Sequence, residues 1–242
     1  MRAARIGIAC AGVLMWGGRA DAQWYVTSFT GANATRPATV TLDQPAIGRH
    51  LDFQDVTFEA RPMQSPQYYG LRIGRHLGAR FGVEVEFLHI KVIAHTERIV
   101  HVTGLVADGA VDTQMPMNQI VQRHNTTHGL NYWMANLAWR RPLRAPYVRR
   151  PVTLILRAGA GPVMPGVDAV VDHVSVQGYQ FSGFGGQLSA GLDVHVRRWF
   201  SLTAEYKLTR TRPELEISGG TTRMTALSHH VAAGFALGFG QR

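Results

Sequence analysis

The stretch GVEVEFLHIKV, residues 82–92, most strongly limits the folds that are open to this chain. Apolar and acidic side chains alternate along it: Val83, Glu84, Val85, Glu86 and Phe87. Because successive side chains of a β-strand point to opposite faces, such a strand is apolar on one face and charged on the other. The same alternation recurs elsewhere in segments of about ten residues, which is typical of strands that cross a membrane in a β-barrel.

We predict eight such strands, at residues 23–32, 67–77, 81–94, 128–140, 152–163, 183–197, 200–212 and 225–239. Helical periodicity is poor, and short connections alternate with long ones at 33–66, 95–127 and 164–182. These observations predict an all-β fold, a single eight-stranded antiparallel transmembrane β-barrel with a filled polar lumen, short periplasmic turns and long extracellular loops. The rival fold is a soluble eight-stranded barrel, which requires the apolar face to be inside.

The charged face of these strands contains both signs of charge. Its ionisable members are Arg72, Glu84, Glu86, Arg157, Asp193, Glu205 and Lys207. A charge enclosed in a narrow lumen is costly unless it is paired. We therefore expect the acids and bases to form an ion network that plugs the barrel, and we expect no open pore at eight strands.

The N-terminal segment predicts export. Arg2 and Arg5 precede an apolar run from Ile6 to Trp16, and the small residues around Ala22 follow. This order is typical of a secretory signal, so we assign residues 1–22 to a signal peptide and 23–242 to the outer-membrane barrel domain. The single cysteine, Cys10, leaves with the signal, which excludes thiolate catalysis and cysteine-ligated metals in the mature chain.

The charge of the mature chain indicates its partners. The signal contains three of the 25 basic and one of the 16 acidic residues, so 22 and 15 remain and the formal charge is +7. A basic exported protein suits anionic surfaces, so we expect lipopolysaccharide, its lipid A and other outer-membrane lipids as partners, and no nucleic acid. The ending GFALGF resembles the signal read by the barrel-assembly machinery. We expect a monomer in the outer membrane of a Gram-negative bacterium.

Polar residues in the predicted outer halves of four strands, together with one at mid-height, form a candidate catalytic set. Its members are His89, Lys91, His128, Glu205, Lys207 and His230. Strict alternation directs His89 and Lys91 towards lipid, but a β-bulge near Leu88 would turn them inward. Two interpretations stay open: an active site that opens sideways to the outer leaflet, or an interfacial belt whose histidines and lysines contact lipid phosphates.

Four stretches also bear a family resemblance: PQYYGLRIG, GVEVEFLHIKV, HGLNYWMANLAWR and SLTAEYKLTRTR. They resemble the outer-membrane lipid A oxidase family of alphaproteobacteria, within the broader superfamily of eight-stranded OmpA-type barrels. The resemblance implies oxygen-dependent oxidation of the proximal glucosamine of lipid A to 2-aminogluconate, with release of hydrogen peroxide. It transfers no catalytic role to an individual residue.

The sequence leaves the cofactor unknown. No flavin site is recognisable, and a divalent metal held by His89, His128 and His230, together with Glu205, is the chemically reasonable route to such an oxidation. The alternative function is a non-enzymatic structural or adhesive OmpA-type barrel that binds lipopolysaccharide through basic loops. Convergence of the six candidate residues favours the enzyme, and their dispersal favours the alternative.

Overall fold

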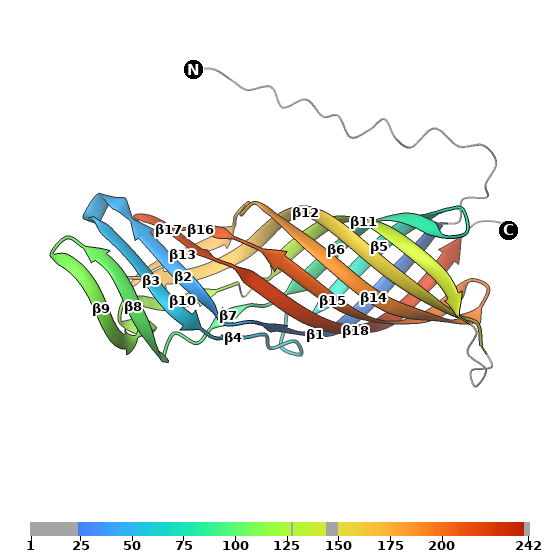
Figure 1. Cartoon of the computed structure of the whole chain (residues 1–242), viewed down its shortest axis with the longest axis horizontal. Helices are drawn as coiled ribbons and strands as arrows, with labels where there is room; N and C mark the ends of the chain where they lie inside the picture. The colour runs from blue at the N-terminus through green and yellow to red at the C-terminus, as the bar shows by residue number, and fades with distance from the viewer. Residues whose placement is uncertain (1–23, 127, 144–149, 240–242) are drawn as a thin grey trace, which may run out of the picture.

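Eight antiparallel strands close into a barrel in the computed structural model, which describes residues 24–126, 128–143 and 150–239 (Figure 1). In order around the barrel they are β1 (Trp24–Thr35), β5 (Tyr69–Leu77), β6 (Phe81–Ile90), β11 (Leu130–Leu143), β12 (Val152–Val171), β14 (Phe184–Arg197), β15 (Phe200–Thr211) and β18 (Ala226–Phe239). The first strand, β1, pairs along its whole length with the last, β18, from Trp24 opposite Phe239 to Thr35 opposite Ser228. The ring therefore has no open edge.

The predicted fold class is confirmed, and each predicted strand corresponds to one strand of the barrel. The boundaries differ mainly at the end away from the chain termini, where β12 continues to Val171 and β6 stops at Ile90. The predicted signal peptide, residues 1–22, lies outside the described residues. In the part of the chain that the structure describes, no helix is long and apolar enough to cross a membrane.

An apolar belt surrounds the half of the barrel that contains the chain termini. Its exposed aliphatic members include Leu71, Ile73, Val85, Leu137, Leu156, Leu188, Leu192, Leu202 and Val231. Exposed aromatic residues flank the belt, with Trp24, Phe81, Trp199 and Phe239 at the periplasmic end and Tyr69, Trp133 and Tyr206 towards the other end. An apolar band between two aromatic girdles is the exterior of a transmembrane barrel, and it excludes the soluble alternative.

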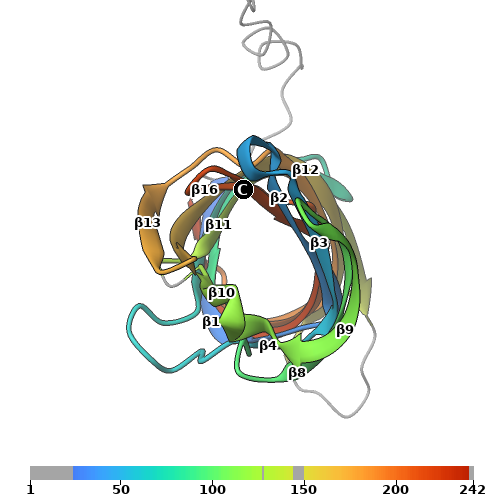
Figure 2. The ribbon, with the colours of Figure 1, turned by 90° about the vertical axis from the view of Figure 1, so that its left-hand side faces the viewer.

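The long connections predicted as loops consist largely of strands. A second sheet has the order β16 (Glu214–Ile217), β17 (Gly220–Met224), β2 (Ala38–Gln44), β3 (Arg49–Val56), β8 (Ile99–Val106) and β9 (Gly109–Pro116). The outer half of β12 is extended by β13 (Val174–Tyr179), β10 (Val121–Asn125), β7 (Ile93–Ala94) and β4 (Phe58–Glu59). Figure 2, viewed onto the extracellular end, shows these strands continuing the wall of the barrel.

This extracellular layer has an apolar interior, which explains why its segments form strands. The buried core includes Val40, Leu42, Leu51, Phe53, Val102, Val121, Val167 and Val171. Alternate residues of β2 and β3 supply the first four of these, so two-residue alternation continues into the first long connection. The long connections therefore lie at the predicted extracellular end, but they form strands where irregular loops were expected.

The polarity of the inner face reverses along the strands. In β6 the inward residues are Glu84 and Glu86, followed by Leu88 and Ile90, all of them buried. The same change occurs in β11, through Asn136, Met134, Tyr132 and Leu130, and in β12, through Arg157, Val163, Val167 and Ala169. The interior is thus charged where the exterior faces lipid and apolar where the exterior faces water.

A buried histidine connects the two groups of extracellular strands. His124 of β10 is 2% exposed, and its Nε2 atom lies 3.0 Å from the hydroxyl oxygen of Thr222 in β17. Burial lowers the pKa of His124 from 6.5 to about 4. The folded layer therefore keeps this imidazole neutral at a pH where the unfolded chain protonates it.

The extracellular layer should lose stability in acid because of His124. Its contribution is complete above pH 6.5, is lost as the pH falls from 6.5 to about 4, and amounts to about 3 kcal/mol. We expect amide hydrogen exchange in β10 and β17, corrected for the intrinsic effect of pH, to accelerate across this window. The acceleration should be smaller in His124→Gln, and an equal pH dependence in both proteins would contradict the assignment.

Candidate functional site

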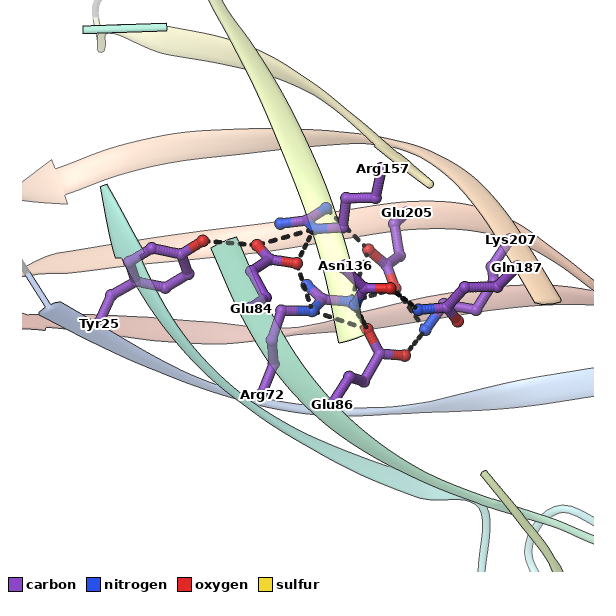
Figure 3. Close-up of polar contacts among 9 residues, drawn as sticks. All are labelled: Tyr25, Arg72, Glu84, Glu86, Asn136, Arg157, Gln187, Glu205 and Lys207. Atoms are coloured by element: carbon purple, nitrogen blue, oxygen red, sulfur yellow. Dashed lines mark hydrogen bonds and ion pairs between the residues drawn. The ribbon is translucent and has the colours of Figure 1, made fainter. Parts of the chain in front are cut away.

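Three carboxylates and three cations meet in the lumen of the barrel (Figure 3). They are Glu84 and Glu86 of β6, Arg72 of β5, Arg157 of β12, and Glu205 and Lys207 of β15. Arg72 contacts Glu86 at 2.8 Å and Glu205 at 2.9 Å. Arg157 contacts Glu84 at 2.9 Å and Glu205 at 3.0 Å. Lys207 contacts Glu205 at 3.1 Å and also pairs with Glu86.

This ion cluster is electrically neutral and enclosed. The exposed fraction of each of the six side chains is 7% or less. Uncharged groups also donate hydrogen bonds to the carboxylates: Tyr25 donates to Glu84 at 2.5 Å and Asn136 donates to Glu86 at 3.2 Å. Gln187 in turn donates to Asn136 at 2.6 Å. Such pairing is what allows charges to occupy a narrow lumen.

The predicted ion network is therefore present, with one difference. Asp193 is not a member of the ion cluster. It lies along a cavity of about 340 Å³ at the periplasmic end, which Arg140 and His195 also line. The sequence pattern gave the correct face for Asp193 but not its height along the strand. The other six residues meet as expected because β6, β5, β12 and β15 bring them to one level.

Three of the six candidate catalytic residues lie in this lumen. Glu205 and Lys207 are members of the ion cluster, so their charges are already paired. His230 of β18 is 1% exposed, and its Nε2 atom lies 2.9 Å from the hydroxyl oxygen of Thr209. Glu205, Lys207 and His230 therefore belong to the packed interior of the barrel.

The other three candidates lie outside the ion cluster: His89 is on the outer face of β6, and Lys91 and His128 lie in the connections next to the ends of β6 and β11. The pairing of β6 with β5 and β11 continues without a register shift past Leu88 to His89, so no bulge turns His89 inward. The β-bulge near Leu88 that would have turned His89 inward is absent, and the outward direction given by strict alternation holds for His89. Lys91 donates to the carbonyl oxygens of Gln64 and Ser65 at 2.9 and 3.0 Å, and His128 is exposed just before β11.

The histidines predicted to hold a metal do not form one group. His89 faces outward from β6, whereas His230 faces the lumen from β18. Within residues 24–126, 128–143 and 150–239, no cluster of three or more histidine, cysteine, aspartate or glutamate side chains could hold a metal ion. The barrel wall therefore separates His89 from His230.

His89 nevertheless has an unusual environment on the outer face. Its Nδ1 atom lies 2.8 Å from Oδ1 of Asn131, and Asn131 uses its amide nitrogen to donate to the carbonyl oxygen of Met164 at 3.1 Å. The oxygen of Asn131 can only accept, so Nδ1 of His89 carries the proton and Nε2 has a free lone pair. That Nε2 atom is buried and has no hydrogen-bond partner, and the ring stacks on Tyr69 with 5.0 Å between centroids.

Gly129 makes this environment possible. It has a φ of 95°, and a side chain added at Gly129 would overlap the imidazole ring of His89. A residue without a side chain therefore allows the turn before β11 to cover His89 closely.

A basic cleft on another part of the exterior was not predicted. Its charged members are Arg36, Arg212 and Arg223, and it has a volume of about 420 Å³. Arg212 follows β15, whose outward residues include Tyr206 and Leu208 and then Arg210. The arginines therefore begin where the apolar belt ends. We define the basic cleft by Arg36, Arg212 and Arg223.

A chain of hydrogen bonds orients one arginine of the basic cleft. Arg36 donates through Nε to Nε2 of His229 at 3.1 Å, and Nδ1 of His229 lies 2.5 Å from the hydroxyl oxygen of Tyr206. Arg223 is partly neutralised, because it pairs with Glu214 at 3.1 Å. The signal for this cleft was present in the sequence, since Arg210, Arg212 and His229 interrupt the lipid-facing alternation of their strands.

Comparisons with known proteins give structural similarities alone. No family model and no curated protein matches the sequence. Neisserial surface protein A has 9% identity and a TM-score of 0.41, with 92% of this chain and 100% of that chain covered. The outer-membrane protein OprG of Pseudomonas aeruginosa has 11% identity and a TM-score of 0.42, covering 92% and 98%. The attachment invasion locus protein Ail of Yersinia pestis, solved with sucrose octasulfate, has 12% identity and a TM-score of 0.37, covering 90% and 100%.

The chain is a barrel of the bacterial outer membrane. Three features of its geometry show this: a closed eight-stranded ring, an apolar belt between aromatic girdles, and a lumen filled with charged side chains. The end with the chain termini and short turns is periplasmic, and the basic cleft and His89 lie towards the extracellular end.

Breaking the ion cluster should strongly destabilise the barrel. Arg72→Met leaves Glu86 and Glu205 short of a partner in the lumen, and we expect a loss of about 3–5 kcal/mol in the free energy of unfolding. The measurement is urea unfolding of the protein in detergent, followed by its electrophoretic mobility. Arg75→Met, on the outer face of the same strand beside Trp24, is the matched control and should cost about 1 kcal/mol or less. Equal losses in the two variants would contradict a role for the cluster.

Proposed function

We propose that this protein binds lipopolysaccharide of the outer leaflet by its lipid A phosphates, on the exterior of the barrel. The basic cleft is the observation that carries this proposal. Three guanidinium groups line one cleft directly beyond the apolar belt. Acyl chains alongside the belt would place the phosphates of lipid A at this height.

The chemistry of the basic cleft suits a phosphate. Guanidinium groups bind phosphate oxygens through paired N–H donors, and charge-assisted hydrogen bonds of this kind are among the strongest in proteins. Tyr206 and His229 hold Arg36 in place, which reduces the entropy lost on binding. Glu214 weakens the attraction at Arg223, so Arg36 and Arg212 should contribute most.

The distribution of the six candidate catalytic residues supports binding over oxidation as the main function. They are divided by the barrel wall, and Glu205 and Lys207 are already paired in the ion cluster. Binding needs no convergence of these residues. It depends on exterior groups alone, and the arginines of the basic cleft are such groups.

Removing two arginines of the basic cleft should weaken lipid A binding. We expect Arg36→Gln combined with Arg212→Gln to lower the affinity of the protein in nanodiscs for fluorescent lipid A by roughly tenfold or more. The matched control is Arg61→Gln combined with Arg98→Gln, which removes the same charge from other extracellular segments. Dephosphorylated lipid A should bind the native protein and the cleft variant equally. Unchanged affinity for phosphorylated lipid A in the cleft variant would refute the proposal.

A second candidate function, oxidation of lipid A, is favoured by the environment of His89. Its Nε2 lone pair is unpartnered, Asn131 fixes the tautomer, and the residue lies on the outer face near the aromatic girdle. A neutral imidazole held this way can accept the proton of the hydroxyl group at C1 of the proximal glucosamine. The C1–H hydrogen and its electron pair would pass to dioxygen, which with the second proton becomes hydrogen peroxide, and the sugar becomes a lactone. Water then opens the lactone and supplies the added oxygen atom.

Mass spectrometry of lipid A tests this second function. Cells that produce an oxidising enzyme should contain lipid A that is heavier by one oxygen atom, and His89→Gln should abolish that gain while the barrel still folds. His101→Gln is the control, because it changes an extracellular histidine of β8 that pairs with Asp112, outside this environment and outside the basic cleft. An unchanged lipid A spectrum in aerated cells with correctly inserted protein would leave lipopolysaccharide binding as the function.

A further inference from the structure

We propose that a second cleft, next to the basic cleft, binds sugar residues of the lipopolysaccharide core. This inference rests on the proposed binding of lipid A phosphates. The cleft has a volume of about 690 Å³. We call it the aromatic cleft and define it by Tyr179, Phe181, Glu214 and Glu216, which line it together with Gln180, Ser182 and Arg212.

The side chains of the aromatic cleft match the chemistry of a saccharide. Tyr179 is 65% exposed and Phe181 is 61% exposed, so two aromatic groups face solvent at its wall. A sugar ring presents C–H groups on its faces, which stack on aromatic rings, and hydroxyl groups on its edge. The hydroxyl groups need both acceptors and donors. The carboxylates of Glu214 and Glu216 supply acceptors, and the guanidinium of Arg212 supplies donors.

Other ligand classes fit this cleft less well. Two exposed carboxylates disfavour a further phosphate group, because like charges repel. They also disfavour an acyl chain, which cannot satisfy them. An uncharged, hydroxyl-rich ligand with an apolar face is the class that uses both the rings and the carboxylates.

The wall of the aromatic cleft is fixed before any ligand arrives. Gln180 donates through its amide nitrogen to the carbonyl oxygen of Glu216 at 3.1 Å, and its amide oxygen accepts from the backbone N–H of Glu216 at 2.8 Å. The backbone N–H of Ser182 donates to the carbonyl oxygen of Val163 at 3.0 Å, and Phe181 packs edge-on against Phe184 at 5.7 Å. A segment held this way loses little conformational entropy on binding.

Arg212 connects the two clefts, because it lines both of them. In lipopolysaccharide the phosphorylated glucosamines of lipid A continue directly into the core sugars, which extend away from the membrane. A phosphate in the basic cleft would therefore place the following sugars beside Arg212, at the entrance to the aromatic cleft. The two clefts adjoin at Arg212, as the phosphates of lipid A and the core sugars adjoin in the molecule.

Saturation-transfer NMR tests the aromatic cleft directly. The probe is the soluble core oligosaccharide released by mild acid from lipopolysaccharide of the bacterium that encodes this chain, added to the full-length mature protein in nanodiscs. We expect transfer from aromatic protons to sugar-ring protons, and a loss of that transfer when Tyr179→Ala and Phe181→Ala are combined. Trp199→Ala combined with Phe239→Ala, at the periplasmic girdle, should leave the transfer intact. Absent transfer in the native protein, or equal transfer in the aromatic-cleft variant, would overturn the proposal.

A parallel measurement separates this inference from the proposed function. The aromatic-cleft variant should bind complete lipopolysaccharide roughly tenfold more weakly than the native protein, yet bind lipid A without sugars equally well. Arg36→Gln should weaken the binding of both ligands. If the aromatic-cleft variant binds complete lipopolysaccharide normally while Arg36→Gln binds it poorly, the sugar subsite is refuted and lipid A binding stands. If Arg36→Gln also binds lipid A normally, lipid A binding fails as well.

Discussion

The pairing of buried charges in the lumen is the constraint on which the rest of the barrel depends. Three carboxylates and three cations share one enclosed space, and each of them contacts at least one opposite charge there. A single unpaired member would carry a large desolvation cost, so four strands must hold their side chains at one level. That requirement specifies strand register more strictly than a plain apolar pattern would.

The reversal of polarity along the strands allows the same barrel wall to be stable in lipid at one end and in water at the other. Lipid surrounds the periplasmic half, so charge is inside and apolar groups are outside. Water surrounds the extracellular half, and there Leu88, Ile90 and their neighbours fill an apolar interior. The exterior changes at the same height, from Leu208 to Arg210 on β15 and from Phe87 to His89 on β6. Polar exterior groups are therefore brought to the headgroup region of the outer leaflet, where the basic cleft and His89 lie.

Much of the fold could be predicted, because two-residue alternation assigns each side chain to a face. Glu84 and Arg72 were placed on the same face from alternation alone, and they meet in the structure. The candidate site was harder to predict. The sequence indicates that His89, Lys207 and His230 lie in the outer halves of their strands, but the distance between them across the barrel depends on register and on the side of the wall that each one faces. The arginines of the basic cleft were missed because they come from segments far apart in the chain.

The sequence by itself determined the strand number, the direction of each face and the membrane environment, since these follow from local alternation and connection length. Only the tertiary structure decided that the outer connections form a β-layer with its own core, because that core joins β2, β3, β8, β10 and β12. It also decided that the six candidate residues are divided by the wall and that the arginines converge. Contacts between distant segments depend on barrel closure and strand register, which no single stretch of sequence contains.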